Sequence, residues 1–230
     1  MTTALFGDEL LERPRRELAP GAVHVPGWLS LTQQAWMADR FREWSAGPVP
    51  LRAASVRGHE MSVKTVCLGW HWQPYRYTRE AIDVNGVRVS ALPEWLVRVG
   101  RLAVAEAYGN DPEAAGYAPD TALVNYYDDA AKMGMHQDKD EISLEPVVSL
   151  SIGNSCLFRF GNTETRTRPY EDLTLASGDL FVFGGPSRLA YHGVMKTYPC
   201  SAPAGCGMGA GRINITLRVT GLEQKESTHE

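Results

Sequence analysis

Residues 121–141 read TALVNYYDDAAKMGMHQDKDE, and the chemistry expected of the chain begins within this segment. It contains His136-Gln137-Asp138, a His-X-Asp pair whose outer side chains can point the same way on an extended backbone. A second histidine, His192, follows in the segment SRLAYHGV. Two imidazoles and one carboxylate on one face of a metal leave the opposite positions open, which suits Fe(II). We therefore expect His136, Asp138 and His192 to bind one Fe(II) ion and to form the catalytic centre.

A polar strand is expected after the second histidine. Residues 212–218 read RINITLR, and on a strand the alternate residues of this run, which are its polar ones, share one face. Four polar side chains on one face are unusual for a core strand, but they suit the wall of a polar pocket. There Arg212 can bind a carboxylate through two parallel hydrogen bonds.

This ordered set of motifs resembles the AlkB family of Fe(II)- and 2-oxoglutarate-dependent dioxygenases. The resemblance runs from about residue 61 to residue 218, and HQDKDE and RINITLR are its most specific parts. It implies O2-dependent repair of alkylated bases in single- or double-stranded DNA, or in RNA, with release of an aldehyde, succinate and CO2. The motifs that carry it are, in chain order, Asn125-X-Tyr127, His136-X-Asp138, Asp140, His192 and Arg212-X-Asn214-X-Thr216-X-Arg218.

The resemblance also implies a role for individual side chains. Arg212 would pair with the far carboxylate of 2-oxoglutarate, because a buried carboxylate without a partner is costly. Arg218 would lie near the iron-bound end of the cosubstrate, with a strand-end salt bridge as the alternative. Asp140 would face the damaged base, with a solvent-facing place in a charged run as the alternative. The further contacts to 2-oxoglutarate would come from Asn125, Tyr127 and Asn214.

Residues from about 61 to 92 are expected to form a lid that recognises the nucleotide. Aromatic residues alternate there with arginines, which favours a base-stacking surface. Asn85-Gly86 between two short apolar runs predicts a type I′ hairpin, while Trp72 suits a core position as well as it suits the lid. The resemblance places Trp70 against the modified base and Tyr75 and Tyr77 near the nucleic acid strand. Candidates for phosphate contacts are Arg166, Lys132, Arg159, Arg168 and Arg188.

The expected fold is mainly β with flanking helices, a double-stranded β-helix (jelly roll) with an N-terminal helical and hairpin-lid extension. Helices are predicted from Ser30 or Thr32 to about Ser45, and from Pro93 to Gly109. From residue 121 onward, short predicted strands alternate with turn residues, as in double-sheet jelly rolls. These strands cover residues 121–127, 146–152, 156–160, 172–175, 179–183, 189–194 and 212–219.

One domain over residues 1–230 is expected, because a chain of this length with 43% hydrophobic residues can bury a sizeable core. Residues 1–25 are expected to be an extended arm on the surface, anchored by Leu5 and Phe6. The jelly-roll core is placed at 121–220 and a flexible tail at 221–230. His24 and His59 are expected to lie on the surface.

The composition limits the partners. A net charge of −4 and a pI near 5.9 argue against a basic nucleic-acid coat, so any contact with DNA must be a local patch. The four cysteines (Cys67, Cys156, Cys200 and Cys206) form no CxxC pair and are interpreted as reduced thiols of a cytoplasmic protein. No secretory signal or membrane-length apolar segment is found. We expect a monomer without a membrane partner.

Two other function classes stay open. A dioxygenase acting on a protein or a small metabolite would keep the iron and Arg212, but would not need the aromatic lid. A non-enzymatic jelly-roll binding module would not need the iron ligands and Arg212 together. The histidines could also be ordinary hydrogen-bonded residues or structural zinc ligands, although structural zinc sites usually have four ligands, often cysteines.

Overall fold

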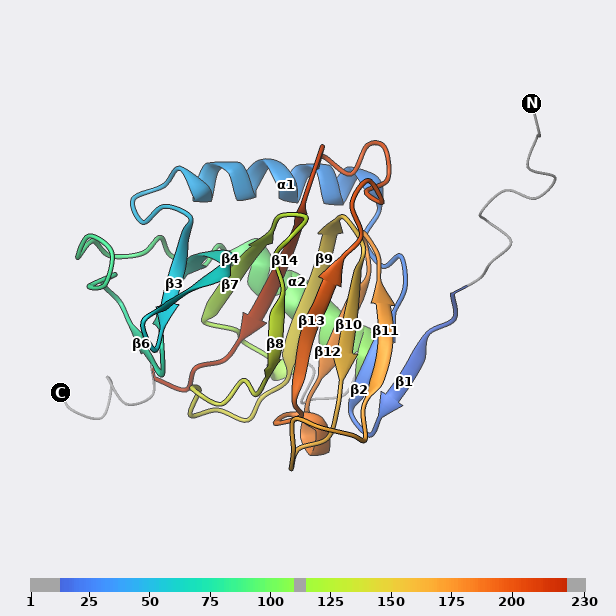
Figure 1. Cartoon of the computed structure of the whole chain (residues 1–230). Coiled ribbons are helices and arrows are strands. Elements are labelled where there is room, and N and C mark those ends of the chain that lie inside the picture. The colour runs from blue at the N-terminus through green and yellow to red at the C-terminus, as the bar shows by residue number, and fades with distance from the viewer. Residues whose placement is uncertain (1–12, 110–114, 223–230) are drawn as a thin grey trace.

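The computed structural model describes residues 13–109 and 115–222, and its centre is a pair of facing antiparallel sheets (Figure 1). The large sheet contains, in spatial order, β1 (Arg16–Ala19), β2 (Ala22–Val25), β12 (Leu180–Phe183), β9 (Val147–Gly153), β14 (Arg212–Arg218), β7 (Thr121–Tyr127), β4 (His59–Leu68) and β3 (Arg52–Val56). The small sheet contains β11 (Glu171–Leu175), β10 (Cys156–Phe160), β13 (His192–Thr197) and β8 (Met133–His136). This confirms the jelly-roll expectation, although the two sheets do not close into a barrel within the described residues.

Two apolar cores position the large sheet. One lies between its outer face and the helices α1 (Leu31–Ser45) and α2 (Glu94–Tyr108), and Ile213, Ile215 and Leu217 of β14 are fully buried in it. The other lies between the sheets, where Phe158 and Phe160 of β10 contact the rings of β12. Because side chains alternate along a strand, the polar residues of β14 face the small sheet.

Both predicted helices are confirmed, and their ends follow the expected chemistry. Ser30 caps α1, since its side chain accepts a hydrogen bond from the backbone N–H of Gln33 and the Gln33 side chain accepts one from the Ser30 N–H. Pro93 precedes α2 and Gly109, with φ of +93°, ends it. No helix of the described residues is both long and apolar enough to cross a membrane.

The prediction of a surface arm was wrong for the part of residues 1–25 that is described. Strands β1 and β2 extend the large sheet, with β2 paired to β12. His24, expected on the surface, is 3% exposed, and its Nε2 lies 2.9 Å from Oδ2 of the fully buried Asp179. His59 is exposed as expected. The proposed anchors Leu5 and Phe6, and the tail from residue 223, lie outside the described residues.

The prediction of a type I′ hairpin at Asn85-Gly86 was also wrong. The backbone N–H groups of Val84, Asn85 and Gly86 all bond to the carbonyl of Ala81, which makes a compact loop closed by a bridge between Glu80 and Arg88. Asn85 uses its side chain to accept from the Val87 N–H and to donate to the Pro48 carbonyl. The hairpin in this region is instead β5 (His71–Gln73) paired with β6 (Arg76–Thr78).

Candidate active site

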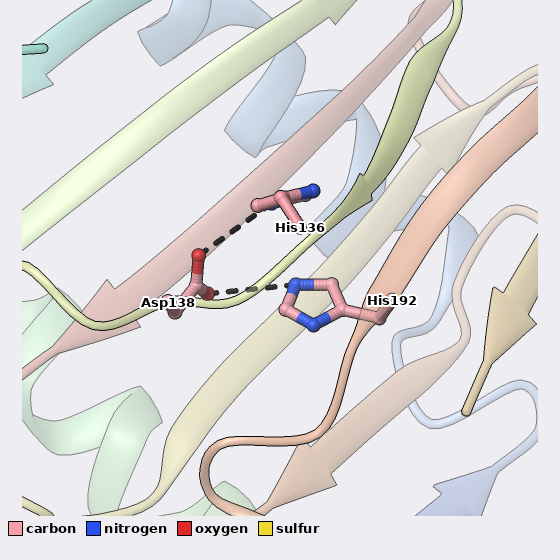
Figure 2. A group of neighbouring side chains, drawn as sticks. All are labelled: His136, Asp138 and His192. Carbon is pink, nitrogen blue, oxygen red and sulfur yellow. Dashed lines mark ion pairs between the residues drawn. The ribbon is translucent and has the colours of Figure 1, made fainter. Parts of the chain in front are cut away.

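Two strands of the small sheet bring the His-Asp-His group together (Figure 2). His136 ends β8 and is the register partner of His192, which begins β13, while Asp138 lies two residues beyond β8. The Nε2 atoms of the two histidines each lie 3.6 Å from one carboxylate oxygen of Asp138. One ligand atom from each residue falls within 4.8 Å of the others, so a single ion can contact all three.

The orientation of both imidazoles fits a metal. Nδ1 of His136 lies 2.9 Å from the carbonyl oxygen of Gly134, and Nδ1 of His192 lies 3.0 Å from that of Ala190. Because a carbonyl only accepts, Nδ1 carries the proton in each ring and Nε2 keeps its lone pair. Both lone pairs therefore belong to the nitrogens that face Asp138.

The electrostatics of the group also fit a cation. Burial would raise the pKa of Asp138, but Arg218 and the two histidines outweigh burial and hold that pKa well below its ordinary value. Burial lowers the pKa of His192 to about 4. The pKa of His136 is raised, since the hydrogen bond and charge of Asp138 outweigh its burial. A cation bound beside Asp138 would take the place of the proton that Asp138 stabilises on His136.

A cavity of about 450 Å³ opens on the His-Asp-His group between the two sheets. Its wall includes the whole polar face of β14, namely Arg212, Asn214, Thr216 and Arg218, with Asn125 and Tyr127 of the neighbouring β7. All five residues predicted to contact 2-oxoglutarate, together with Thr216, thus line one cavity. The volume is that of a site for a small organic ligand.

The buried Arg212 guanidinium has two nitrogens without hydrogen-bond partners among the described residues, and it can bind an anion. The Arg212 side chain is 1% exposed and its Nη2 donates to Ser151 Oγ at 2.8 Å, but Nε and Nη1 have no hydrogen-bond partner among the described residues. Buried polar groups are nearly always hydrogen-bonded, so such an exception indicates a missing partner. A carboxylate in the cavity would supply this partner, and the dicarboxylate 2-oxoglutarate fits it.

The neighbouring amides are already oriented by the sheet. Asn125 Oδ1 accepts from Thr65 Oγ1 at 2.7 Å, which leaves the Asn125 amide nitrogen as the donor. Asn214 Nδ2 donates to Ser149 Oγ at 2.7 Å, and its Oδ1 accepts from Thr216. These contacts fix the amides before any ligand enters.

Arg218 lies inside a buried network of charges. Its Nη2 is 2.8 Å from Asp138 Oδ2, and its Nη1 donates to Glu141 Oε1 at 2.8 Å. The second oxygen of Glu141 accepts from Arg188, which also donates to the backbone carbonyl of Asp138 at 2.6 Å. Arg218, the last residue of β14, therefore forms the strand-end salt bridge that was its alternative role, although a buried one, and Arg188, predicted to contact phosphate, is a buried structural residue.

The lid residues are divided between core and cavity. Trp70 is 5% exposed, lies in a core cluster with Leu123 and stacks under the Arg79 guanidinium at 3.7 Å, so the expectation that it faces a base does not match its position. Tyr77 is also buried, and its hydroxyl donates to Glu141 at 2.5 Å. Trp72, Tyr75, Asp140 and Arg166 do line the cavity.

Three comparisons place this geometry among known proteins. The model of the 2OG-Fe(II) oxygenase superfamily matches residues 21–218. The alpha-ketoglutarate-dependent dioxygenase AlkB of Salmonella typhimurium is 37% identical over 224 residues, covering 93% of this chain and 96% of that protein. The solved structure of OsALKBH1 aligns with a TM-score of 0.76 at 30% identity, covering 88% of this chain and all of the other.

The match with the family model makes the chain a 2OG-Fe(II) oxygenase. Its similarity along nearly the whole length of the Salmonella protein assigns it, within that superfamily, to the AlkB family. A further relative is the DNA N(6)-methyladenine demethylase ALKBH1C of Arabidopsis thaliana, 30% identical over 222 residues. The chain spans about half the length of that relative (49%), while the alignment covers 87% of this chain.

Proposed function

We propose that the protein is an Fe(II)- and 2-oxoglutarate-dependent dioxygenase that oxidatively dealkylates alkylated bases in DNA, with RNA as an alternative substrate. The observation that carries this proposal is one cavity lined both by the His-Asp-His group and by Arg212, whose Nε and Nη1 have no hydrogen-bond partner among the described residues. A binding module would need neither. The Salmonella relative bears the name of a dioxygenase and the Arabidopsis relative that of a DNA demethylase, which agrees with this choice.

In this proposal Fe(II) is bound by Nε2 of His136, the carboxylate of Asp138 and Nε2 of His192. Iron with O2 and 2-oxoglutarate supplies the oxidation of a carbon attached to nitrogen, with release of an aldehyde, succinate and CO2. The chain contributes by orientation. Arg218 and the Arg188–Glu141 pair hold Asp138 from its side chain and its backbone, so the metal-binding carboxylate has one position.

Arg212 is the proposed partner of the far carboxylate of 2-oxoglutarate. Arg212 lines the cavity on the same strand face as Asn214 and Arg218, and its Nε and Nη1 are unsatisfied among the described residues. Asn125, Tyr127 and Asn214 are proposed to hydrogen-bond the cosubstrate, and Arg218 to lie near its iron-bound end.

The nucleotide is proposed to enter by the mouth of the same cavity. Exposed cations line it at Arg57, Lys139 and Arg166, which makes a local positive patch on a chain with a net charge of −4. Tyr75 is 63% exposed at the turn between β5 and β6 and offers a ring there. Since the target atom of a stacked base cannot reach a buried metal, the base must be flipped out or single-stranded.

We also propose that the protein works as a monomer in the cytoplasm. Cys67, Cys156 and Cys206 are buried free thiols, and burial raises the pKa of Cys67 and Cys156, as befits inert cysteines in a reducing compartment. Sedimentation of the purified protein and fractionation of cells would test the two parts.

A panel of substrates tests the proposed function. Methylated and etheno-modified oligonucleotides, single- and double-stranded DNA and RNA, are incubated with Fe(II), 2-oxoglutarate and O2, and the bases are analysed by mass spectrometry. Loss of the alkyl group from at least one oligonucleotide is expected. Turnover of 2-oxoglutarate without any change in the panel would instead favour a protein or metabolite substrate.

A further inference from the structure

We infer that Trp72 is a specificity-determining residue, which selects bases that carry an exocyclic amine by fixing Asp140 in one orientation. This inference rests on the proposed function. The observation behind it is a hydrogen bond from the Trp72 indole N–H to Asp140 Oδ2 at 2.8 Å, made by two side chains that both line the cavity. One oxygen of the carboxylate is thereby occupied by the protein, and the other is left for a ligand.

The position of Trp72 separates it from its neighbour Trp70. Gly69 has φ of +78° and lies so close to the carbonyl of Asp120 that a Cβ atom would clash with it at 2.0 Å. The chain bends at residues 69 and 70, and Trp70 is buried in the core under Arg79, while the partly buried Trp72 packs against the edge of the same core and also lines the cavity. A ligand in the cavity can therefore touch Trp72, whereas Trp70 is covered.

Trp72 is held rigidly from both sides. Its backbone N–H donates to Cys67 Sγ at 3.5 Å, and its carbonyl accepts from Arg52 at 2.7 Å. The side chains before and after it point to the other face of β5, where His71 contacts Asp83 at 2.5 Å and Gln73 is 8% exposed. With its backbone held in this way and its ring packed against the core, Trp72 can hold Asp140 with little loss of entropy when a base binds.

The orientation of Asp140 sets a chemical rule. An ionised carboxylate accepts hydrogen bonds but cannot donate them. The oxygen that Trp72 leaves open therefore favours the amine of adenine or cytosine and disfavours the O4 acceptor of thymine. Without the indole N–H, the carboxylate can rotate away and its preference is weakened.

The test measures discrimination between two probes. Single-stranded oligonucleotides with one 1-methyladenine or one 3-methylthymine are titrated by fluorescence anisotropy into the protein loaded with Fe(II) and 2-oxoglutarate without O2. Trp72→Phe keeps a ring but loses the N–H, and should reduce the ratio of the two affinities about ten-fold, equal to ~1.4 kcal/mol. Asp140→Asn should lower the ratio in the same direction, and the double variant should add little to either single change.

Trp70→Phe is the matched control, because it removes the same atoms from the core of the same region. It should lower the melting temperature and leave the ratio unchanged. An unchanged ratio in Trp72→Phe, or an equal fall in Trp70→Phe, would overturn the role of Trp72. If Trp72→Phe does not fold, an unchanged ratio in Asp140→Asn overturns it. Failure to dealkylate any oligonucleotide of the panel would overturn the proposed function, whereas an unchanged ratio in a protein that dealkylates the panel overturns only the role of Trp72, so the two failures are distinct.

Discussion

Replacement of Arg212 by lysine should weaken 2-oxoglutarate binding by about ten- to a hundred-fold. Arg212 is 1% exposed, one of its nitrogens is used by Ser151, and Nε and Nη1 are unpaired and available to a ligand. Lysine keeps the charge but loses the planar fork. A carboxylate that was bound through the fork then loses at least one charge-assisted hydrogen bond, worth about 1.5–3 kcal/mol, and each ~1.4 kcal/mol is ten-fold in affinity.

Calorimetric titration of the iron-loaded protein without O2 measures this change. The matched ligand is 2-oxobutyrate, which has the same 2-oxo acid but lacks the far carboxylate, so its affinity should be nearly the same in both proteins. The matched control variant is Arg159→Lys. In the wild type the Arg159 guanidinium pairs with Asp172, and Arg159 does not line the cavity. Equal 2-oxoglutarate affinities in Arg212→Lys and wild type would refute the role of Arg212, and equal losses for both ligands would indicate general damage to the site.

Three further changes test other parts of the molecule. His136→Ala should abolish dealkylation and weaken Fe(II) binding measured by equilibrium dialysis, with the melting temperature of the metal-free form little changed because this side chain is one-third exposed; full activity after the metal is stripped and restored would defeat the assignment. Asp179→Asn should reduce the free energy of unfolding by about 3–5 kcal/mol, since it leaves His24 and Arg13 without their buried partner; a loss within the error of urea titration would be contrary to this. Burial would raise the pKa of Asp179, but hydrogen bonds from His24, Arg13 and two backbone amides outweigh burial and lower that pKa. The contribution of Asp179 to stability is therefore present above the unfolded pKa of about 3.9 and is lost as the pH falls through the lower folded pKa. Wild type should accordingly lose more stability on acidification than Asp179→Asn does.

The polar strand could be predicted because its pattern is local. In β14 the apolar residues at every second position are fully buried against the helices, and the intervening polar ones must face the other way. The His136-X-Asp138 pair followed by His192 likewise indicates a metal site from the residue types alone. The helices could be predicted for the same reason, since their caps lie within a few residues of their ends.

The charge network behind Asp138 could not be read from sequence spacing. Glu141 stands only three residues after Asp138 in the chain, but its partners Arg188 and Arg218 are 47 and 77 residues away. A glutamate at the end of a charged run has the same pattern whether it is solvated or buried. Only the three-dimensional structure shows that the Glu141 carboxylate accepts hydrogen bonds from both arginines and that Arg188 is buried instead of facing a phosphate.

The lid was the weakest part of the sequence prediction for a physical reason. Trp70 and Trp72 are two residues apart and would share a face on a regular strand, but Trp70 lies in the bend between β4 and β5, whereas Trp72 lies in β5. Asn85-Gly86 has the composition of a tight hairpin turn, yet its first residue does not adopt the positive φ that a type I′ turn requires, and its side chain binds Pro48 and Val87 instead. Tertiary contacts decided both outcomes.

The most direct test of the central claim is the stoichiometry of one reaction. A single-stranded oligonucleotide with one 1-methyladenine is incubated with the protein, Fe(II), 2-oxoglutarate and O2, and the restored adenine, formaldehyde and succinate are measured together. Equal amounts of all three are expected, and none when iron, 2-oxoglutarate or O2 is withheld or when Arg212 is replaced by methionine. Restored adenine without succinate, or succinate at the same rate with and without the oligonucleotide while the methyl group is retained, would contradict it.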